Sequence, residues 1–432
     1  MWYNGRRKHG GTGGGTVKII KKYNSISLMV RIVIGLAIGI ILGLISSDIP
    51  VIDTLGTVFV GTLKAIAPVL VLLLVVSSLA QGEKLDRRFG HVILLYMVST
   101  LLAAVVAVAG SFLFPQTLKL AGRAAGGTVP TQMTDVLNNL LNDMVTNPIS
   151  ALLEGKYIGI LFWAVIFGLA ARKVCSDQTK KMMSNLADLM SQVVRWVFNL
   201  APFGIMGLVY SSVAKRGLSI FGDYGAIILL LVGCMLSVAL VTNPLLVWLS
   251  LRRNPYPLVF RCLRGSAVAA FFTRSSAANI PVNMELCKKL GMDEEMYAVS
   301  IPLGATVNMD GAAITIAVMA LAAANTVGVQ VTFPAALMLA IVASLAACGT
   351  SGVAGGSLLL IPLACSLFGV DPDVAMQVVG VGFVISVVQD SVETALNSSS
   401  DVLFSATAEY AQWKKKGKSL PTFLGGNTKV DV

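Results

Sequence analysis

Residues 273–281 read TRSSAANIP and residues 349–357 read GTSGVAGGS, and both stretches interrupt otherwise apolar segments of the chain. Glycine and small polar residues weaken a helix and free backbone N–H and C=O groups. Hydrocarbon cannot satisfy such groups, so broken backbone at membrane depth is tolerated only where it is buried in protein or lines a cavity. We therefore expect segments 256–290 and 333–370 to form re-entrant helix–tip–helix hairpins, with these stretches as the first tip and the second tip.

The alternative interpretation of both tips is that their small residues only let helices pack closely. Each tip, however, precedes a long apolar helix that carries acids: Asp310 follows the first tip, and Asp390 and Asp401 follow the second. Such duplication is typical of transporters built from inverted repeats, whose binding site lies where the broken helices meet. The duplication favours the hairpins.

The composition predicts an all-α integral membrane protein. Hydrophobic residues make up 55% of the 432 residues and charged residues only 13%, with a mean hydropathy of +0.78. Several apolar runs approach the roughly 20 residues that cross about 30 Å of hydrocarbon. The first half is expected to form helices near 26–46, 51–80, 90–114, 148–172, 184–214 and 224–251, with an outer loop at 115–147.

The net charge of +11 is explained by basic residues between the apolar runs. If the basic N-terminus is cytoplasmic, nearly all basic clusters fall on the inner side of the membrane, as is usual. They are Lys84, Arg87, Arg88, Arg172, Lys173, Lys180, Lys181, Arg252, Arg253, Lys288, Lys289, Lys414, Lys415, Lys416 and Lys418. This distribution predicts contact with membrane lipid in the inner (plasma) membrane and argues against nucleic acid. Both termini are expected in the cytoplasm: a disordered segment 1–25 and a tail 411–432.

Residues 388–401 read VQDSVETALNSSSD and place a polar ladder on one helix face. Asp390, Thr394, Asn397 and Asp401 follow at i, i+4, i+7 and i+11, within a stripe of roughly 60°. An ionised carboxylate in the bilayer needs a cation, a partner or water, so the ladder indicates an ion or substrate path. The alternative, a solvated face at a helix end, suits Asp401 in part but not Asp390.

A second polar stretch, GATVNMDG at 304–311, lies inside an apolar helix that reaches Ala324. Asn308, Asp310 and backbone carbonyls near glycine supply only oxygen ligands, which suit a hard cation such as Na⁺. Six cysteines without a C-x-x-C pair and two histidines signal no transition-metal site. Coupling to protons is the alternative, because carboxylates also relay protons.

These motifs resemble the dicarboxylate/amino acid:cation symporter family, most closely its bacterial sodium/serine–threonine members. The resemblance runs from about residue 26 to 410 and rests on TRSS at 273–276, NMDG at 308–311, GTSGV at 349–353 and the ladder. It implies a glutamate-transporter-like fold of eight transmembrane helices and two re-entrant hairpins, assembled as a homotrimer. Helices 1–6 would occupy 26–254, with helices 1, 2, 4 and 5 as scaffold. Helices 3 and 6 would move as an elevator with a transport core at 255–410 (hairpin 1 256–290, helix 7 293–325, hairpin 2 333–370, helix 8 373–408).

The resemblance also assigns ligands for a small amino acid and for co-transported Na⁺, with no organic cofactor. Asp390 and Thr394 would bind the α-amino group, while Asn397, Ser276 and backbone of the second tip would hold the carboxylate. The implied substrate set is Ser276, Ser351, Val353, Asp390, Glu393, Thr394 and Asn397. The implied sodium sets are Asp401 with Gly304, Asn308 and Asn397; Thr306, Ala347, Cys348 and Thr350; and Asp310 with Asn308, Tyr96, Ser99 and Thr100.

Two positions depart from the family pattern. Glu393 stands where members that carry acidic substrates have arginine, so glutamate or aspartate would be repelled, whereas a serine or threonine hydroxyl could donate to it. Alternatively, or in addition, Glu393 pairs with Arg274 of the first tip. Ala312 stands where related symporters often have threonine, which weakens the third sodium set. We predict a sodium-coupled importer of serine and threonine; the alternative is a sodium- or proton-coupled carrier of acidic amino acids or dicarboxylates.

Two other classes fit the sequence less well. An intramembrane protease would use Ser275, or Asp310 with Asp390, but the chain places no histidine or lysine base near those serines and no Gly-x-Gly-Asp motif at either aspartate. An ion channel would need a continuous pore, and it would not need a second tip that closes over a bound substrate. The sequence therefore predicts that the chain is not an enzyme.

Overall fold

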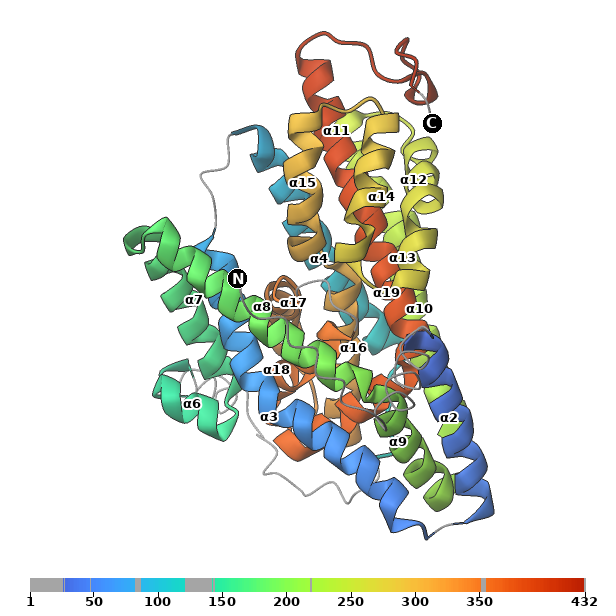
Figure 1. Cartoon of the computed structure of the whole chain (residues 1–432). Coiled ribbons are helices and arrows are strands. Elements are labelled where there is room, and N and C mark those ends of the chain that lie inside the picture. Colours follow the sequence, from blue (N-terminus) through green and yellow to red (C-terminus); the bar gives the residue numbers. More distant parts are fainter. Residues whose placement is uncertain are drawn as a thin grey trace, which may run out of the picture.

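The computed structural model describes residues 26–430 except 27, 47, 82–86, 121–141, 143, 218–219 and 351–354. The predicted disorder of residues 1–25 therefore lies outside the described residues, as do Ser351 and Val353 of the second tip. Helices dominate the described part of the chain, as predicted (Figure 1).

The first half follows the predicted order of helices, with two differences. Gly155 ends a short helix in a left-handed conformation (φ 65°), so the segment predicted at 148–172 forms two helices. The segment predicted at 184–214 begins earlier, at Asp177, and bends by 53° next to Pro202. The helices are α2 (Leu28–Ile45), α3 (Pro50–Ala80), α4 (Arg87–Leu113), α6 (Pro148–Glu154), α7 (Tyr157–Val174), α8 (Asp177–Asn199), α9 (Ala201–Arg216) and α10 (Ile220–Ser237), which continues through a π turn (Val238–Thr242) into α11 (Asn243–Leu251).

The second half is broken at both tips. The first tip separates α13 from α14 at Arg274 and Ser275; at the second tip, α17 ends at Ala347 and the next described element, a 3-10 turn, begins at Gly356. A third break, at Asn308 and Met309, interrupts the helix that was predicted to be continuous over 293–325. The elements are α12 (Tyr256–Cys262), η3 (Leu263–Ala267), α13 (Val268–Thr273), α14 (Ser276–Lys289), α15 (Glu294–Val307), α16 (Asp310–Thr326), α17 (Phe333–Ala347), η4 (Gly356–Leu360), α18 (Ile361–Ser366) and α19 (Pro372–Lys415).

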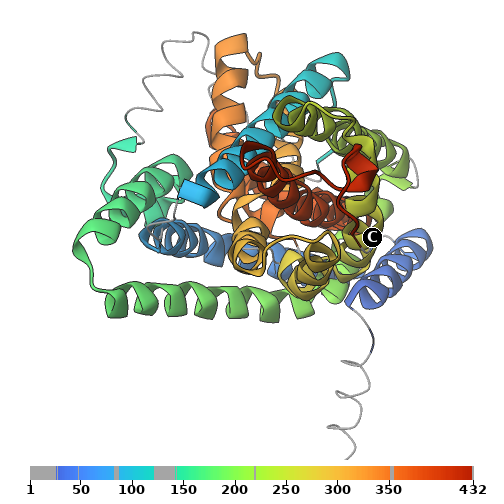
Figure 2. The same cartoon turned by 90° about the horizontal axis from the view of Figure 1, so that it is seen from above.

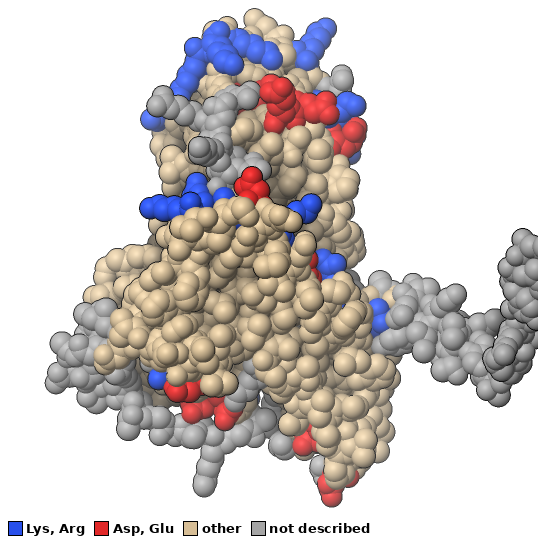
Figure 3. All heavy atoms as spheres, turned by 60° about the vertical axis from the view of Figure 1, so that its left-hand side comes forward, with Lys and Arg blue, Asp and Glu red and all other residues tan. Residues whose placement is uncertain are grey.

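Several helices meet the requirements for membrane spans. Among the described residues, five helices are long and apolar enough to cross a membrane, and the number is six if the bent pair α8–α9 counts as one span. On the face seen in Figure 3, charged side chains gather at different heights and leave a broad uncharged surface between them. The all-helical membrane class is therefore confirmed, whereas eight spans and re-entrant hairpins remain predictions.

One group of helices, α2, α3 and α9, is joined through glycine. A Cβ atom on Gly35 of α2 would lie 2.2 Å from the carbonyl oxygen of Pro202, and one on Gly207 of α9 would lie 2.4 Å from the backbone nitrogen of Gly56. Backbones in such contact leave no room for a side chain, and small residues are what allow membrane helices to approach so closely. Figure 2 shows that α7 and α8 lie along the outer edge of the molecule on the same side as α3.

The second group is built around α16, which is buried from Asp310 to Ala324. It is covered by α4, α10, α17, α18 and α19, and alanine is its most frequent residue. Polar atoms on α16 and on the facing side of α19 are therefore shielded from both lipid and water.

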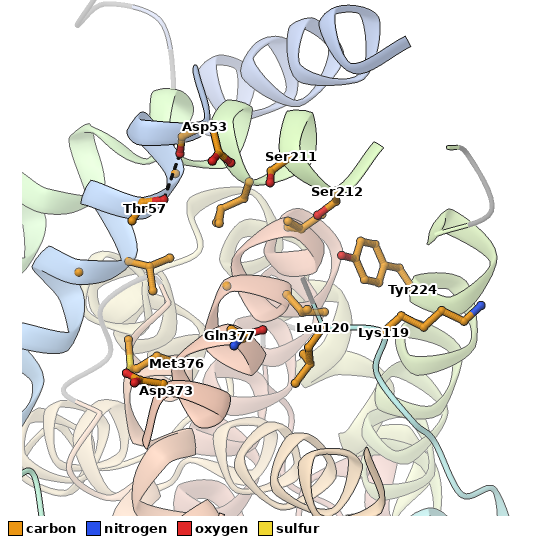
Figure 4. A pocket seen from close by; sticks show the side chains of 18 residues that line it. Asp53, Thr57, Lys119, Leu120, Ser211, Ser212, Tyr224, Asp373, Met376 and Gln377 are labelled. Carbon is orange, nitrogen blue, oxygen red and sulfur yellow. Dashed lines mark hydrogen bonds between the residues drawn. The ribbon is translucent and has the colours of Figure 1, made fainter. Parts of the chain in front are cut away.

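A cavity of about 470 Å³ lies between the two groups, where α3 and α9 face α10 and the start of α19. Figure 4 shows Asp53, Ser211, Tyr224 and Gln377 around it. The two groups of helices are thus in contact, but the cavity separates part of their facing surfaces.

Candidate functional site

The ladder on α19 faces the protein interior. Asp390, Thr394, Asn397 and Asp401 expose 2%, 5%, 3% and 0% of their surface. The interpretation of Asp401 as part of a solvated helix end is therefore wrong, because α19 continues for four more turns to Lys415 and buries this position. Each polar atom of the ladder must find a partner or a ligand inside the protein.

Asp390 connects both tips. Arg274 adopts a left-handed conformation (φ 52°) at the end of α13, and its Nε donates to Asp390 Oδ2 at 2.7 Å. The other carboxylate oxygen accepts a hydrogen bond from the backbone N–H of Gly355 at 3.1 Å. The suggested pairing of Arg274 with Glu393 is therefore wrong: among the described residues, Arg274 forms its ion pair with Asp390 and none with Glu393.

Glu393 is instead held by neutral donors. Its Oε2 accepts hydrogen bonds from Thr315 at 2.7 Å, from Ser357 at 2.9 Å and from the Gln389 amide. The sequence analysis missed Thr315 and Ser357. Thr315 is the only hydroxyl in the apolar run 312–324, and that isolation was the available signal. No cation pairs with Glu393 among the described residues, and an ionised carboxylate without a cation disfavours an anionic group nearby.

The first implied sodium set is brought together around Asp401. The Asn308 amide donates to Asp401 Oδ1 at 2.9 Å and to the Asn397 carbonyl at 3.3 Å. A Cβ on Gly304 would lie 2.7 Å from the same carboxylate oxygen, so glycine is required there. Two buried oxygens, Asn308 Oδ1 and Asp401 Oδ2, have no hydrogen-bond partner in the described part of the chain. Buried acceptors without donors suit a hard cation.

The third implied set surrounds Asp310. Ser99 donates to its Oδ2 at 2.7 Å, Thr100 to its Oδ1 at 3.3 Å, and Asn243 to its Oδ2 at 3.0 Å. Asn243 was not predicted. It follows directly after the π turn in the span that ends at Leu251, and π turns inside helices often mark functional positions. The Asn-Pro pair within an apolar run was the signal in the sequence.

Tyr96 was implied as a ligand of the third set, but its hydroxyl contacts the first. This hydroxyl lies 3.1 Å from the carbonyl oxygen of Asp401 and 2.9 Å from the hydroxyl of Ser405. Asn397 is fixed by its Oδ1, which accepts from the Gly311 N–H at 2.7 Å. Thr394 donates to the Asp390 carbonyl at 2.7 Å. The first and third implied sodium sets and the ladder therefore belong to one hydrogen-bond network at the break between α15 and α16.

The second implied set lies where that break meets the second tip. Cys348 is within 3.4 Å of the Val307 carbonyl, next to Thr306, and the Thr350 hydroxyl donates to the Ala347 carbonyl at 2.9 Å. Ser276 is buried at the start of α14. The arrangement can bind an amino group and cations at acids, and a carboxylate at the ends of helices.

Comparison with known proteins identifies the family. The model of the sodium:dicarboxylate symporter family matches residues 28–410. A serine/threonine transporter SstT from Bifidobacterium adolescentis is 60% identical over 403 residues, covering 93% of this chain and 94% of that protein. Proteins of the same name from Streptococcus agalactiae and Streptococcus thermophilus are 54% and 53% identical, covering 92% of this chain and 100% and 99% of theirs. The chain therefore belongs to the sodium:dicarboxylate symporter family, and it is a multi-pass membrane transporter and not an enzyme.

Proposed function

We propose that this chain imports serine and threonine across the plasma membrane together with sodium. The observation that carries the substrate class is the environment of Glu393: a buried carboxylate beside the ladder whose hydrogen-bond donors among the described residues are all neutral. Such a group accepts a hydroxyl and repels a second carboxylate. The names of the curated relatives agree with this proposal.

Substrate binding would exchange one partner of Asp390 for another. The α-amino group would take the place of the Arg274 guanidinium on Asp390, with Thr394 beside it. The carboxylate would bind Asn397, Ser276 and the backbone of the second tip, including Ser351 and Val353, where helix N-termini favour an anion. The substrate hydroxyl would then donate to Glu393, which distinguishes serine and threonine from apolar amino acids.

Sodium would be held by the three implied sets. The unpaired oxygens of Asn308 and Asp401 support the first, and Asp310 with its hydroxyl neighbours supports the third. Asn397 belongs to both the ion and the substrate sets, and Asn308 of the ion sets donates to its carbonyl, so binding of one ligand would order groups that the other needs. Shared groups of this kind couple two binding free energies.

We further propose that helices 1, 2, 4 and 5 form a scaffold in a homotrimer. Helices 3 and 6 would move as an elevator with the transport core, in a fold of eight spans and two re-entrant hairpins with both termini in the cytoplasm. The glycine contacts of α2, α3 and α9 support a rigid scaffold, and the cavity between the two groups supports movement of one against the other.

A carrier for acidic amino acids is the second candidate, because Arg274 places a buried guanidinium in the site. If Arg274 left Asp390, it could pair with a side-chain carboxylate of the substrate. This possibility makes aspartate the most informative competitor.

The test is uptake of radiolabelled serine into proteoliposomes with and without an inward sodium gradient, with excess aspartate as competitor. We expect sodium-dependent uptake that aspartate leaves unchanged and that Asp390→Asn abolishes, while Asp177→Asn, an exposed acid at the start of α8, retains it. Uptake without a sodium gradient at the same rate would refute the coupling ion. Inhibition by aspartate would favour the second candidate.

A further inference from the structure

The segment after α19 folds back onto the protein. Leu420 and Leu424 are buried in a core cluster with Leu251 and Trp413, and the guanidinium of Arg261 lies 4.1 Å from the ring centre of Phe423. The Thr422 N–H donates to the Thr428 carbonyl at 2.9 Å and the Thr428 N–H donates to the Leu420 carbonyl at 3.1 Å, which closes the segment into a loop. Residues 416–430, hereafter the C-terminal loop, therefore form a defined surface at the end of α11 and α19 (Figure 1).

The C-terminal loop closes a pocket of about 520 Å³ that is lined by four cations and no acid. The cations are Arg252 and Arg253, which follow α11, and Lys414 and Lys418, at the end of α19. Figure 3 shows basic side chains gathered at this end of the molecule. None of the four forms an ion pair with a carboxylate of the described residues.

Three of these side chains are held in place by neutral contacts. The guanidinium of Arg252 lies 5.0 Å from the ring centre of Trp248, Lys414 Nζ donates to the Leu251 carbonyl at 3.0 Å, and Lys418 Nζ lies 3.3 Å from the ring centre of Trp413. Holding like charges together is unfavourable unless an anion compensates them. Cations that are already positioned lose little entropy when an anion binds.

Glycine brings the far wall of the pocket close to these cations. A Cβ on Gly425 would lie 3.6 Å from Arg253 Nη1, and one on Gly426 would lie 1.9 Å from the Leu420 carbonyl oxygen. Gly425 also has a positive φ of 76°, so side chains are disfavoured at both positions. The backbone of this turn therefore lines the pocket next to the Arg253 guanidinium.

We propose that this pocket binds a phosphate group. Guanidinium and ammonium groups together match the charge and oxygen geometry of phosphate. Arg252 directly follows the apolar span that ends at Leu251, and exposed Trp248 lies one turn earlier, as is usual at a membrane interface. The phosphate can therefore belong to an anionic lipid headgroup or to a soluble anion, and the site is independent of the proposed substrate.

The test uses the purified full-length protein in detergent and measures its thermal unfolding midpoint. One arm adds inorganic phosphate; the other adds phosphatidylglycerol, with phosphatidylcholine as the neutral lipid. The double variant Arg253→Gln/Lys418→Gln removes two lining charges, whereas Lys288→Gln/Lys289→Gln removes two exposed charges at the end of α14, outside the pocket. We expect a raised midpoint in wild type and control, and a need for about tenfold more ligand in the double variant.

Stabilisation by inorganic phosphate assigns a soluble anion, and stabilisation by phosphatidylglycerol alone assigns a lipid headgroup. Equal responses of the two double variants, or no response beyond that to phosphatidylcholine in either arm, would overturn the proposal. A measurement on the wild type avoids any folding defect: bound ligand should slow tryptic cleavage after Lys418 but not after Lys288. Unchanged cleavage after Lys418 at saturating ligand also counts against the site.

Discussion

Small residues have different roles in two regions of the molecule. One region is formed by α2, α3 and α9, and the other by the broken helices around α16 and α19. In the first region, glycines at Gly35, Gly56 and Gly207 bring backbones into contact along continuous helices. In the second region, helices stop at Asn308 and at both tips, and the freed backbone and side chains carry acids and amides. Small residues at the surface of an intact helix give rigidity, whereas the same residue types inside a broken helix give binding groups.

The largest expected effect is in the broken region. Asp401→Asn removes the charge from the first sodium set, and loss of one partner of a buried charge pair costs about 3–5 kcal/mol, a factor of roughly a hundred or more. The sodium concentration for half-maximal serine uptake should rise accordingly. Glu409→Gln is the matched control, since Glu409 lies two turns later on α19 and accepts from the Trp413 indole at 2.8 Å. An equal change in both variants would remove Asp401 from the ion site.

The next effect belongs to the glycine-packed region. Gly207→Val forces a side chain against α3 and should lower the free energy of unfolding by about 1–3 kcal/mol, as overpacking does. The control is Gly233→Val on α10, where a Cβ would meet no atom within 4 Å. The thermal unfolding midpoint of the purified proteins in detergent checks this prediction. If both variants have the same unfolding midpoint, the close packing of α3 and α9 does not stabilise this region.

Substrate selection should change less than ion binding. Glu393→Gln removes the negative charge but keeps an acceptor, so aspartate should compete with serine about tenfold better, a change of roughly 1.4 kcal/mol. Competition in the uptake assay measures this. Glu393→Asp keeps the charge and should still exclude aspartate. If Glu393→Gln excludes aspartate as well as wild type does, Glu393 does not select the substrate.

The smallest effect concerns the support of Asp310. Asn243→Ala removes one hydrogen bond to a buried carboxylate, worth about 1 kcal/mol, so sodium affinity should fall several-fold. Asn254→Ala, in the exposed turn after α11, is the control. Sodium titration of uptake distinguishes the two, and equal affinities would show that Ser99 and Thr100 alone position Asp310.

The sequence by itself determined the membrane class, the helix order and the members of the ladder. These depend on local properties, namely the length of apolar runs, helix periodicity and the helix-breaking tendency of glycine and small polar residues. The positions of both tips and of Asp390, Asn397 and Asp401 follow from such patterns alone. The observed boundaries differ from the predicted ones where a single turn decides them, as at Gly155 and Pro202.

Only the tertiary structure decided the pairing of these groups. Arg274 and Asp390 lie 116 residues apart, and Glu393 reaches Thr315 across 78 residues, so no local pattern specifies either contact. The same holds for the contact of Asn243 with Asp310 and for the pocket lined by the C-terminal loop, because both depend on segments that are distant in the sequence. A buried charge must be compensated by whichever groups the fold brings within hydrogen-bond distance, and that choice is a property of packing between distant segments.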